Sequence, residues 1–325
     1  MAVTNNADPS RLGQINKAGD AKALFLKKWS GEVLTTFETE CVMKNLHLVK
    51  TITEGKSAQF PVTGTATAAY HTPGKNILEG DNGLLSKIGH NEKVINIDDL
   101  LTSSVFVANI DEAMNHYDTR SIYTTELGRA LANAWDKRSL QAMVLAARAA
   151  ATITGGHGGT VLQKGSTVAT TGSELAAAIF EAAQRLDEKN VPEAERYVVV
   201  RPAQYYLLAQ TTDVINKDWG GSGVYADGKV LKIAGITIVK SNHLPSTNIS
   251  AASGENNTYN GDFTDTVAVV FQKGAIGTVK LLDLKTESDY LVSHQGTLVV
   301  SKYALGTGIL RPECAVEISK ASPQS

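Results

Sequence analysis

The feature that most constrains this chain is a long excursion over residues 49–97 that cannot bury a core of its own. A strand is predicted at 58–62, where apolar residues alternate, and a second strand at 94–97. Between them lies a segment rich in glycine, asparagine, threonine and proline, GTATAAYHTPGKNILEGDNGLLSKIGHNE. An isolated two-stranded hairpin is only marginally stable in water. We therefore expect this long arm to lie on another surface, such as that of a neighbouring subunit.

The same arm contains Gly55, Lys56 and Ser57, the residues that end a phosphate-binding loop. That motif also requires an earlier glycine at the position that Lys50 occupies here. It is followed by a helix, whereas the residues after Ser57 alternate like a strand and include Pro61. We interpret the tripeptide as a turn that enters a hairpin.

The chain has 325 residues, a formal net charge of -2 and 42% hydrophobic residues, which suits one large or two medium domains. The near-neutral charge argues against a general nucleic-acid binder and against a protein of the membrane surface. No apolar run approaches the ~20 residues that span a bilayer, and the N-terminus lacks a secretory pattern. We therefore expect Cys41 and Cys314 to be reduced thiols in a cytosolic product.

The longest helix is predicted over 121–150, and at ~1.5 Å per residue it would be about 45 Å long. Arg138 interrupts its apolar stripe. The stripe consists of Leu127, Leu131, Ala134, Trp135, Ala142, Leu145 and Ala149. A helix of this length would act as a spine for the domain around it.

Three further helix starts are visible. A helical pattern begins at Asp20 and is interrupted by Gly31. Asn109 with Glu112 forms a capping box, which predicts a second start. Ser173 caps a third helix. The apolar face of that third helix consists of Leu175, Ile179, Ala182 and Leu186.

The remaining elements form no regular βαβ repeat, which indicates an α+β fold. Residues 152–172 are predicted as a glycine-rich connection. The last segment is predicted as a strand, a turn that contains Gly306 and Gly308, and a closing strand. The other predictions are strands at 196–200, 230–239 with a glycine bend, 266–272 and 277–291, a short helix at 202–210, and a polar loop at 245–263.

No constellation of catalytic or metal-ligating residues is convincing, so we expect no enzyme activity, no cofactor and no metal site. The seven histidines are scattered, without metal-ligand spacing. His116 and Asp118 would point to different faces of a helix. The GGHGG run at 155–159 resembles the oxyanion loop of esterases, but the chain has no G-x-S-x-G. An esterase that uses His157 is the enzyme hypothesis that stays open.

Several longer stretches follow one another in order from about residue 22 to residue 313. They are AKALFLKKWSGEVLTTF, GKSAQFPVTGTATAAYHTPG, EKVINIDDLL, DEAMNHYDTRSIYTTELG, KNVPEAERYVVV, GTVKLLDLK and SKYALGTGILRPE. Through them the chain resembles the major capsid protein of tailed podophages of the T-seven type.

The resemblance implies the HK ninety-seven-like phage capsid fold, an α+β architecture. It also implies a division into five segments. These are an N-terminal arm at 1–48, an E-loop at 49–97, a P-domain with the long spine helix at 98–165, an A-domain at 166–281, and a C-terminal segment at 282–325 that returns to the P-domain.

The resemblance further implies a structural subunit that self-assembles into the hexamers and pentamers of an icosahedral shell around double-stranded DNA. The implied partners are a scaffolding protein, a portal protein at one vertex, and packaged DNA held without sequence-specific contacts. Whether cement proteins bind is left open, and no membrane partner is expected. The implied location is the virion capsid, assembled in the bacterial host cytoplasm. An encapsulin-type nanocompartment shell of the same fold is the alternative.

Overall fold

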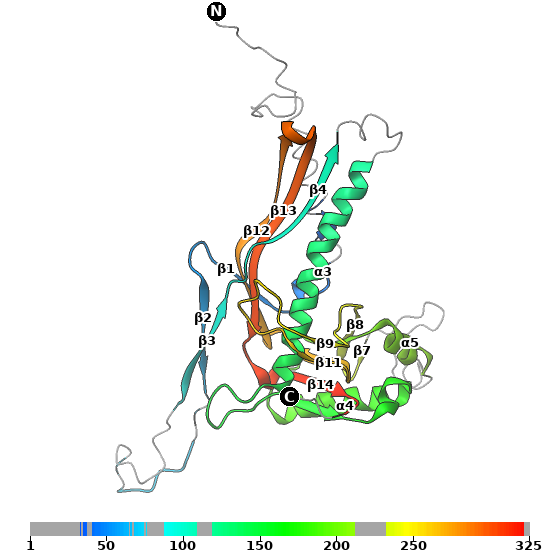
Figure 1. Ribbon diagram of the computed structural model, residues 1–325. Coiled ribbons are helices and arrows are strands. Elements are labelled where there is room, and N and C mark those ends of the chain that lie inside the picture. Colours follow the sequence, from blue (N-terminus) through cyan, green and yellow to red (C-terminus); the bar gives the residue numbers. More distant parts are fainter. Residues whose placement is uncertain are drawn as a thin grey trace, which may run out of the picture.

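The structure is a computed structural model that describes residues 33, 35–37, 41–64, 66, 68–74, 76, 88–108, 119–211 and 232–321. Figure 1 shows an elongated sheet, a wider sheet below it, and a two-stranded arm that leaves the body, with one long helix beside both sheets. The α-helices whose bounds the structure describes are α3 (Thr119–Arg148), α4 (Gly172–Glu188) and α5 (Pro202–Gln210). The arm consists of β2 (Ser57–Thr63) and β3 (His90–Asn96).

The elongated sheet has four strands in the order β1-β12-β13-β4. They are β1 (Leu48–Thr51), β12 (Ile276–Leu291), β13 (Gly296–Ile309) and β4 (Leu101–Ala108). The two long strands form an antiparallel hairpin, β4 pairs antiparallel with one side of it, and β1 pairs parallel with the other side. Segments far apart in the sequence therefore meet in one sheet.

The wider sheet has six strands in the order β5-β14-β11-β6-β8-β7. They are β5 (Thr160–Gln163), β14 (Ala315–Ser319), β11 (Thr266–Gln272), β6 (Arg196–Val200), β8 (Ile236–Lys240) and β7 (Lys232–Ile233). The largest buried cluster fills this part, with the central strands and the apolar face of α4 in its interior. Two short strands, β9 (Asn248–Ile249) and β10 (Gly261–Asp262), pair in the loop beside it.

Both sheets pack on α3. Leu127, Leu131 and Trp135 share buried clusters with side chains of β13. Farther along, residues 139–144 are all buried where the helix reaches β14 and β11. The predicted helix is confirmed, but its buried face widens toward the C-terminus beyond the single stripe. Among the described ranges, no helix combines the length and apolarity that crossing a bilayer requires.

The elements with strong local patterns were predicted well. The face of α4 predicted from the sequence is buried. Strands β6 and β11 and helix α5 have the predicted bounds, and β7 and β8 flank a bend at Gly235. The capping box at Asn109 and the pattern that begins at Asp20 lie outside the described residues.

Two predictions were wrong. Gly306 and Gly308 lie inside β13, which runs without a break to Ile309. Both residues pair with β12, and both are glycines because the arm approaches this strand too closely for a side chain. Residues 152–172 are also more than a connection, because they contain β5, which pairs with β14 at the edge of the wider sheet. A four-residue edge strand carries too short a pattern to be recognised locally.

A buried ion pair joins the end of α3 to the wider sheet. The Arg148 guanidinium donates to both carboxylate oxygens of Glu317, at 2.6 and 2.7 Å. The Glu317 side chain is fully buried and accepts a further hydrogen bond from the Thr266 hydroxyl at 2.6 Å. A bidentate contact with additional hydrogen bonds offsets the cost of removing both charges from water.

We predict that Glu317→Gln destabilises the folded subunit by about 3–5 kcal/mol, because it leaves the Arg148 charge buried without its carboxylate. The measurement is unfolding in guanidinium chloride. The control is Lys285→Ala, which removes an exposed ion pair to Glu287 and should cost at most about 1 kcal/mol. Equal losses in the two variants would contradict the structural role assigned to the buried pair.

Candidate assembly surfaces

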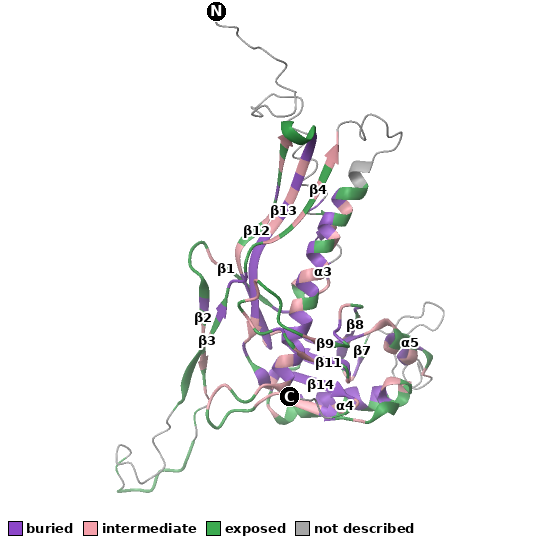
Figure 2. Cartoon of the chain, in the orientation of Figure 1, coloured by how far each residue is buried: buried purple, intermediate pink, exposed green. Residues whose placement is uncertain are grey.

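In the described part of the long arm, buried residues are confined to its root. Strands β2 and β3 pair antiparallel along their lengths, and within them only Ala58 and Ile95 are buried. Both side chains belong to a cluster that includes Leu310 of the body. Every described residue of the tip, residues 66–88, is exposed, and Figure 2 shows the arm extending away from the buried interior. The two predicted strands are confirmed, although β3 begins earlier than 94–97.

The lookalike of a phosphate loop is a turn, as predicted. Gly55 has a φ of 106°, in the left-handed region that glycine adopts readily, and Ser57 begins β2 rather than a helix. The carbonyl of Lys56 accepts a hydrogen bond from the Ile97 backbone N–H at 2.8 Å. The tripeptide therefore helps to close the root of the arm.

Glycines on β13 allow the arm to touch the elongated sheet. A Cβ atom at Gly306 would lie 1.8 Å from the carbonyl oxygen of Asn96, and one at Gly308 would lie 2.8 Å from the Ile95 side chain. Neither space could hold even a methyl group. The direction in which the arm leaves the body therefore depends on bare backbone at these two positions.

Asp98, which follows β3, anchors the exit of the arm. One of its carboxylate oxygens accepts from the Asn256 backbone N–H at 2.8 Å and from the Asn257 side-chain amide at 3.0 Å. The other accepts from the Tyr259 hydroxyl at 2.6 Å, and that hydroxyl accepts from the Thr307 backbone N–H at 2.8 Å. Burial and the adjacent Asp98 raise the pKa of Tyr259, so the phenol stays protonated and donating. Sequence reasoning missed this cluster because its members are distant in the chain.

A cavity of about 470 Å³ lies beside the outer end of the β2–β3 pair. The backbone N–H of Gly64 donates to the carbonyl of Gly89 at 2.8 Å, and both glycines lie against Ile153. The Asn91 side chain donates to the carbonyl of Thr152 at 2.6 Å. The loop after α3 therefore contacts the outer end of the β2–β3 pair, and the cavity is the space between them.

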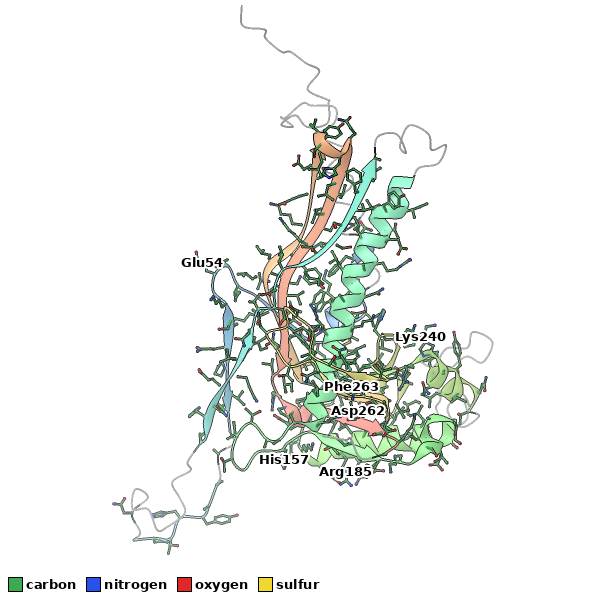
Figure 3. The ribbon with its side chains drawn as sticks, in the orientation of Figure 1. Glu54, His157, Arg185, Lys240, Asp262 and Phe263 are labelled. Atoms are coloured by element: carbon green, nitrogen blue, oxygen red, sulfur yellow. The ribbon has the colours of Figure 1, made fainter. Side chains whose placement is uncertain are left out.

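The groups around this cavity do not form a catalytic arrangement. His157 is exposed on its loop (Figure 3), and the described lining of the cavity contains no serine or cysteine. Lys189 donates to the carbonyl of Gly158 at 2.6 Å, and Arg311 pairs with Glu313. The described part of the chain holds no cluster of residues suited to a metal ion. His116 and Asp118 lie outside the described residues.

The N-terminal segment is tied to α3 by a buried carboxylate. Asp136 accepts hydrogen bonds from the Cys41 thiol at 3.1 Å, the Val42 backbone N–H at 2.9 Å and the Met43 backbone N–H at 3.0 Å. Burial and the neighbouring Asp136 raise the pKa of Cys41. Burial also raises the pKa of Cys314 to about 11. Both cysteines are free and buried, which fits unreactive thiols.

A buried histidine joins the same segment to the elongated sheet. One ring nitrogen of His47 lies 2.7 Å from the carbonyl oxygen of Met43, and the other lies 2.7 Å from the Thr278 hydroxyl. The hydroxyls of Thr278 and Thr307 lie 2.9 Å apart. Burial lowers the pKa of His47 to about 4, so the imidazole is neutral near pH 7.

Large apolar side chains are exposed on several of the main elements that the structure describes. They are Leu48, Val49, Tyr70, Ile88, Val94, Leu100, Phe106, Ile122, Tyr123, Phe180, Tyr206, Leu282 and Val292. The set includes residues of the arm, the outer end of α3, the elongated sheet and the helices of the wider part. Exposed apolar surface distributed in this way suits contacts with other protein chains rather than one small-molecule site.

The fold and these surfaces define the class of protein: an HK ninety-seven-like phage capsid subunit, with two sheets on a spine helix and an arm that lacks its own core. The chain belongs to the Gp10A-like major capsid protein family, whose model matches residues 59–319.

Individual relatives agree with this assignment. The major capsid protein of Escherichia phage T7 is 33% identical over 321 residues, covering 92% of each chain. The capsid structure of the cyanophage P-SCSP1u is 48% identical and has a TM-score of 0.79, covering 97% of this chain and 99% of that one. The mature capsid of bacteriophage PhiM1 shares the fold, with a TM-score of 0.70 at 18% identity, over 85% of this chain and 86% of that one.

The comparisons separate the hypotheses that the sequence left open. The family and the relatives consist of phage capsid proteins, so the encapsulin-type alternative is not favoured. The resemblance drawn from the sequence is confirmed, as is the α+β phage capsid fold.

We predict that Gly306→Ala displaces the arm from the elongated sheet, because the added methyl group would overlap the Asn96 carbonyl. Protease sensitivity at residues 97–100 should rise, and the subunit should lose stability. Gly261→Ala is the matched control, since its Cβ would have ordinary contacts of 3.4 Å. Unchanged cleavage of Gly306→Ala would contradict the close approach.

A second prediction concerns His47 and pH. Its pKa is about 6.5 when unfolded and about 4 when folded, so the unfolded chain binds more protons between these values. The contribution of neutral His47 to stability should be complete above pH 6.5 and lost as the pH falls toward 4. The shift corresponds to about 3 kcal/mol. His47→Gln should be less stable at pH 7, and this part of its pH dependence should disappear. An identical slope in both proteins would contradict the assignment.

Proposed function

We propose that this chain assembles with its own copies into the hexamers and pentamers of an icosahedral shell that encloses the double-stranded DNA of a tailed phage. The observation that carries the proposal is the long arm, whose buried side chains in β2 and β3 all lie at its root. A tip that projects Tyr70 fully into solvent needs a partner surface, and an adjacent subunit supplies one. Membership of a capsid-protein family supports the same conclusion.

The proposed partners follow from this role. A scaffolding protein guides assembly in the bacterial host cytoplasm, and a portal protein occupies one vertex. DNA is held without sequence-specific contacts. The net charge of -2 supports that mode, because a near-neutral shell does not bind the phosphate backbone strongly. Many individually weak contacts between copies add up through multivalency.

We also propose the five-segment division that the resemblance implies, with residues 49–97 as an E-loop and 166–281 as an A-domain. Helix α3 and the elongated sheet would form the P-domain, and most of the wider sheet would belong to the A-domain. Strand β14, in the C-terminal segment, lies in the wider sheet, while β13 lies in the elongated one. That segment would therefore contribute to both parts.

We also propose that the chain has no catalytic role. The cavity beside the arm supports this, because its described lining carries no serine or cysteine beside His157. The capsid family is structural. A screen with generic ester substrates tests the proposal directly, and hydrolysis that His157→Ala abolishes would overturn it.

We predict that replacing residues 66–88 with a short Gly-Ser turn leaves both sheets folded and abolishes closed shells. The fold should persist because the described clusters of buried residues lie outside the replaced stretch. Shells should be lost because the contact between subunits is gone. Circular dichroism and electron microscopy on one sample measure the two outcomes.

A milder variant separates assembly from folding. Tyr70 is fully exposed, so Tyr70→Ser should leave the melting temperature of the subunit unchanged while raising the concentration needed for assembly. The control is Val292→Ser, which also removes exposed apolar area, but on the hairpin of β12 and β13. For the variant that lacks residues 66–88, normal shells would refute the role of the tip in assembly. Loss of the whole fold in that variant would refute the prediction that the two sheets fold without the tip.

A further inference from the structure

A row of buried polar side chains crosses the elongated sheet from the N-terminal segment, residues 41–47, to the exit of the arm. This polar row consists of His47, Thr278 on β12, Thr307 on β13, Tyr259 and Asp98. None of the five residues is more than 3% exposed, so bulk water does not replace a hydrogen bond that is lost there. Each member of the polar row therefore depends on its neighbours for its polar partners.

A carbonyl fixes the directions of the hydrogen bonds at the His47 end. Nδ1 of His47 lies 2.7 Å from the Met43 carbonyl oxygen, which can only accept, so this nitrogen carries the proton. Nε2 of the neutral ring is then an acceptor, and the Thr278 hydroxyl, 2.7 Å away, donates to it. The Thr278 oxygen is left to accept from the Thr307 hydroxyl at 2.9 Å. His47 therefore sets the direction of both threonine hydroxyls.

Thr307 connects these hydroxyls to the arm. Strand β4 pairs with β13 only as far as Tyr303, so the edge of β13 beyond that residue is open to other partners. The backbone N–H of Thr307 donates there to the Tyr259 hydroxyl at 2.8 Å. That hydroxyl donates in turn to Asp98 at 2.6 Å, where the arm leaves the body. Thr307 is therefore the residue at which the two halves of the polar row meet.

The arm also rests directly on the residues beside Thr307. Successive side chains of a strand point to opposite faces, so Gly306 and Gly308 share the face that Thr307 does not. A Cβ atom at Gly306 would meet the backbone of Asn96. One at Gly308 would meet the side chain of Ile95. A displacement of Thr307 would therefore move the surface on which β3 is seated.

We propose that Thr307 couples the N-terminal segment to the arm, so that loss of the His47 hydrogen bond at one end of the polar row loosens the seat of the arm at the other. The hydroxyls of Thr278 and Thr307 have no further hydrogen-bond partner in the described chain, so neither can compensate by turning elsewhere. A buried hydroxyl that loses its partner destabilises the arrangement it belongs to, here the position of β13 beside β3. The coupling acts inside one subunit and does not depend on the proposed shell.

Amide hydrogen exchange of the full chain, followed by mass spectrometry, tests the coupling. Thr278→Val removes the hydroxyl in the middle of the polar row and keeps the shape of the side chain. Exchange should rise at least tenfold in residues 254–259, where two backbone amides donate to Asp98, and stay unchanged in β11. Thr278→Ser, which keeps the hydroxyl, should behave like the unaltered protein.

A matched control lies on the same two strands. The hydroxyls of Thr286 and Ser301 form a second buried pair between β12 and β13, 3.0 Å apart and outside the polar row. Thr286→Val should change the exchange of residues 254–259 by less than twofold. Equal increases from Thr286→Val and Thr278→Val would overturn the proposal, because the effect would then be a general loss of sheet stability.

Coupling between two sites is reciprocal, which gives a test from the other end. Tyr259→Phe removes the hydroxyl at the arm end of the polar row, and it should raise exchange in residues 42–47 at least threefold. This variant leaves His47 and Thr278 in place, so the change does not come from direct damage to the N-terminal segment. Unaltered exchange in residues 42–47 would overturn the coupling, and this result stands by itself if Thr278→Val does not fold.

A double-mutant cycle measures the strength of the coupling. The combined effect of Tyr259→Phe and Thr278→Val on the equilibrium constant of unfolding in guanidinium chloride should fall at least threefold short of the product of the single effects. Tyr259→Phe combined with Thr286→Val should give the product, as independent sites do. A simple product in both cycles would overturn the proposal.

Discussion

The packing of α3 against both sheets is the constraint on which the rest of the structure depends. This 30-residue helix has Trp135 buried under the N-terminal segment and Arg148 bonded to Glu317 of the wider sheet. Because one rigid element carries both contacts, the two sheets keep a fixed relation although they share no strand. A subunit that must present several surfaces to its neighbours at once needs this kind of internal rigidity.

The arm differs from α3, because almost none of its described residues is buried. Its main attachment is the root, where Gly306 and Gly308 admit the backbone of β3 and Asp98 accepts hydrogen bonds from a distant loop. The outer end of β2–β3 has one further contact, from the Asn91 side chain to the Thr152 carbonyl. These contacts define where the arm starts and in which direction it leaves. They give the tip no apolar cover, so its remaining stabilisation has to come from another chain. A rigid root with an uncovered tip is consistent with the capsid family to which the chain belongs.

Buried carboxylates lie at three places where one segment of the described chain meets another. Asp136 holds the N-terminal segment, Asp98 holds the arm, and Glu317 holds the end of α3. A buried carboxylate is costly unless it is satisfied by donors in one geometry, so each of these groups selects a single arrangement of the segments it joins. The remaining contacts are mostly apolar and would tolerate small shifts. In a subunit with long extensions, such polar anchors make the position of each extension unique.

The sequence by itself determined the elements that carry a regular local pattern. Residues close together in the chain determine the apolar stripe of α4, the apolar run of β11 and the length of α3. The stretches that resemble capsid proteins identified the fold. Tertiary structure decided what depends on distant partners. In the sequence Gly306 looks like a turn residue, and only the structure shows that the Asn96 carbonyl lies against it. Asp98 looks like a surface carboxylate, and only the structure shows that the Tyr259 hydroxyl donates to it. The physical reason is that propensity and periodicity act over a few residues, whereas strand pairing, close backbone approach and buried hydrogen bonds join positions far apart in the chain.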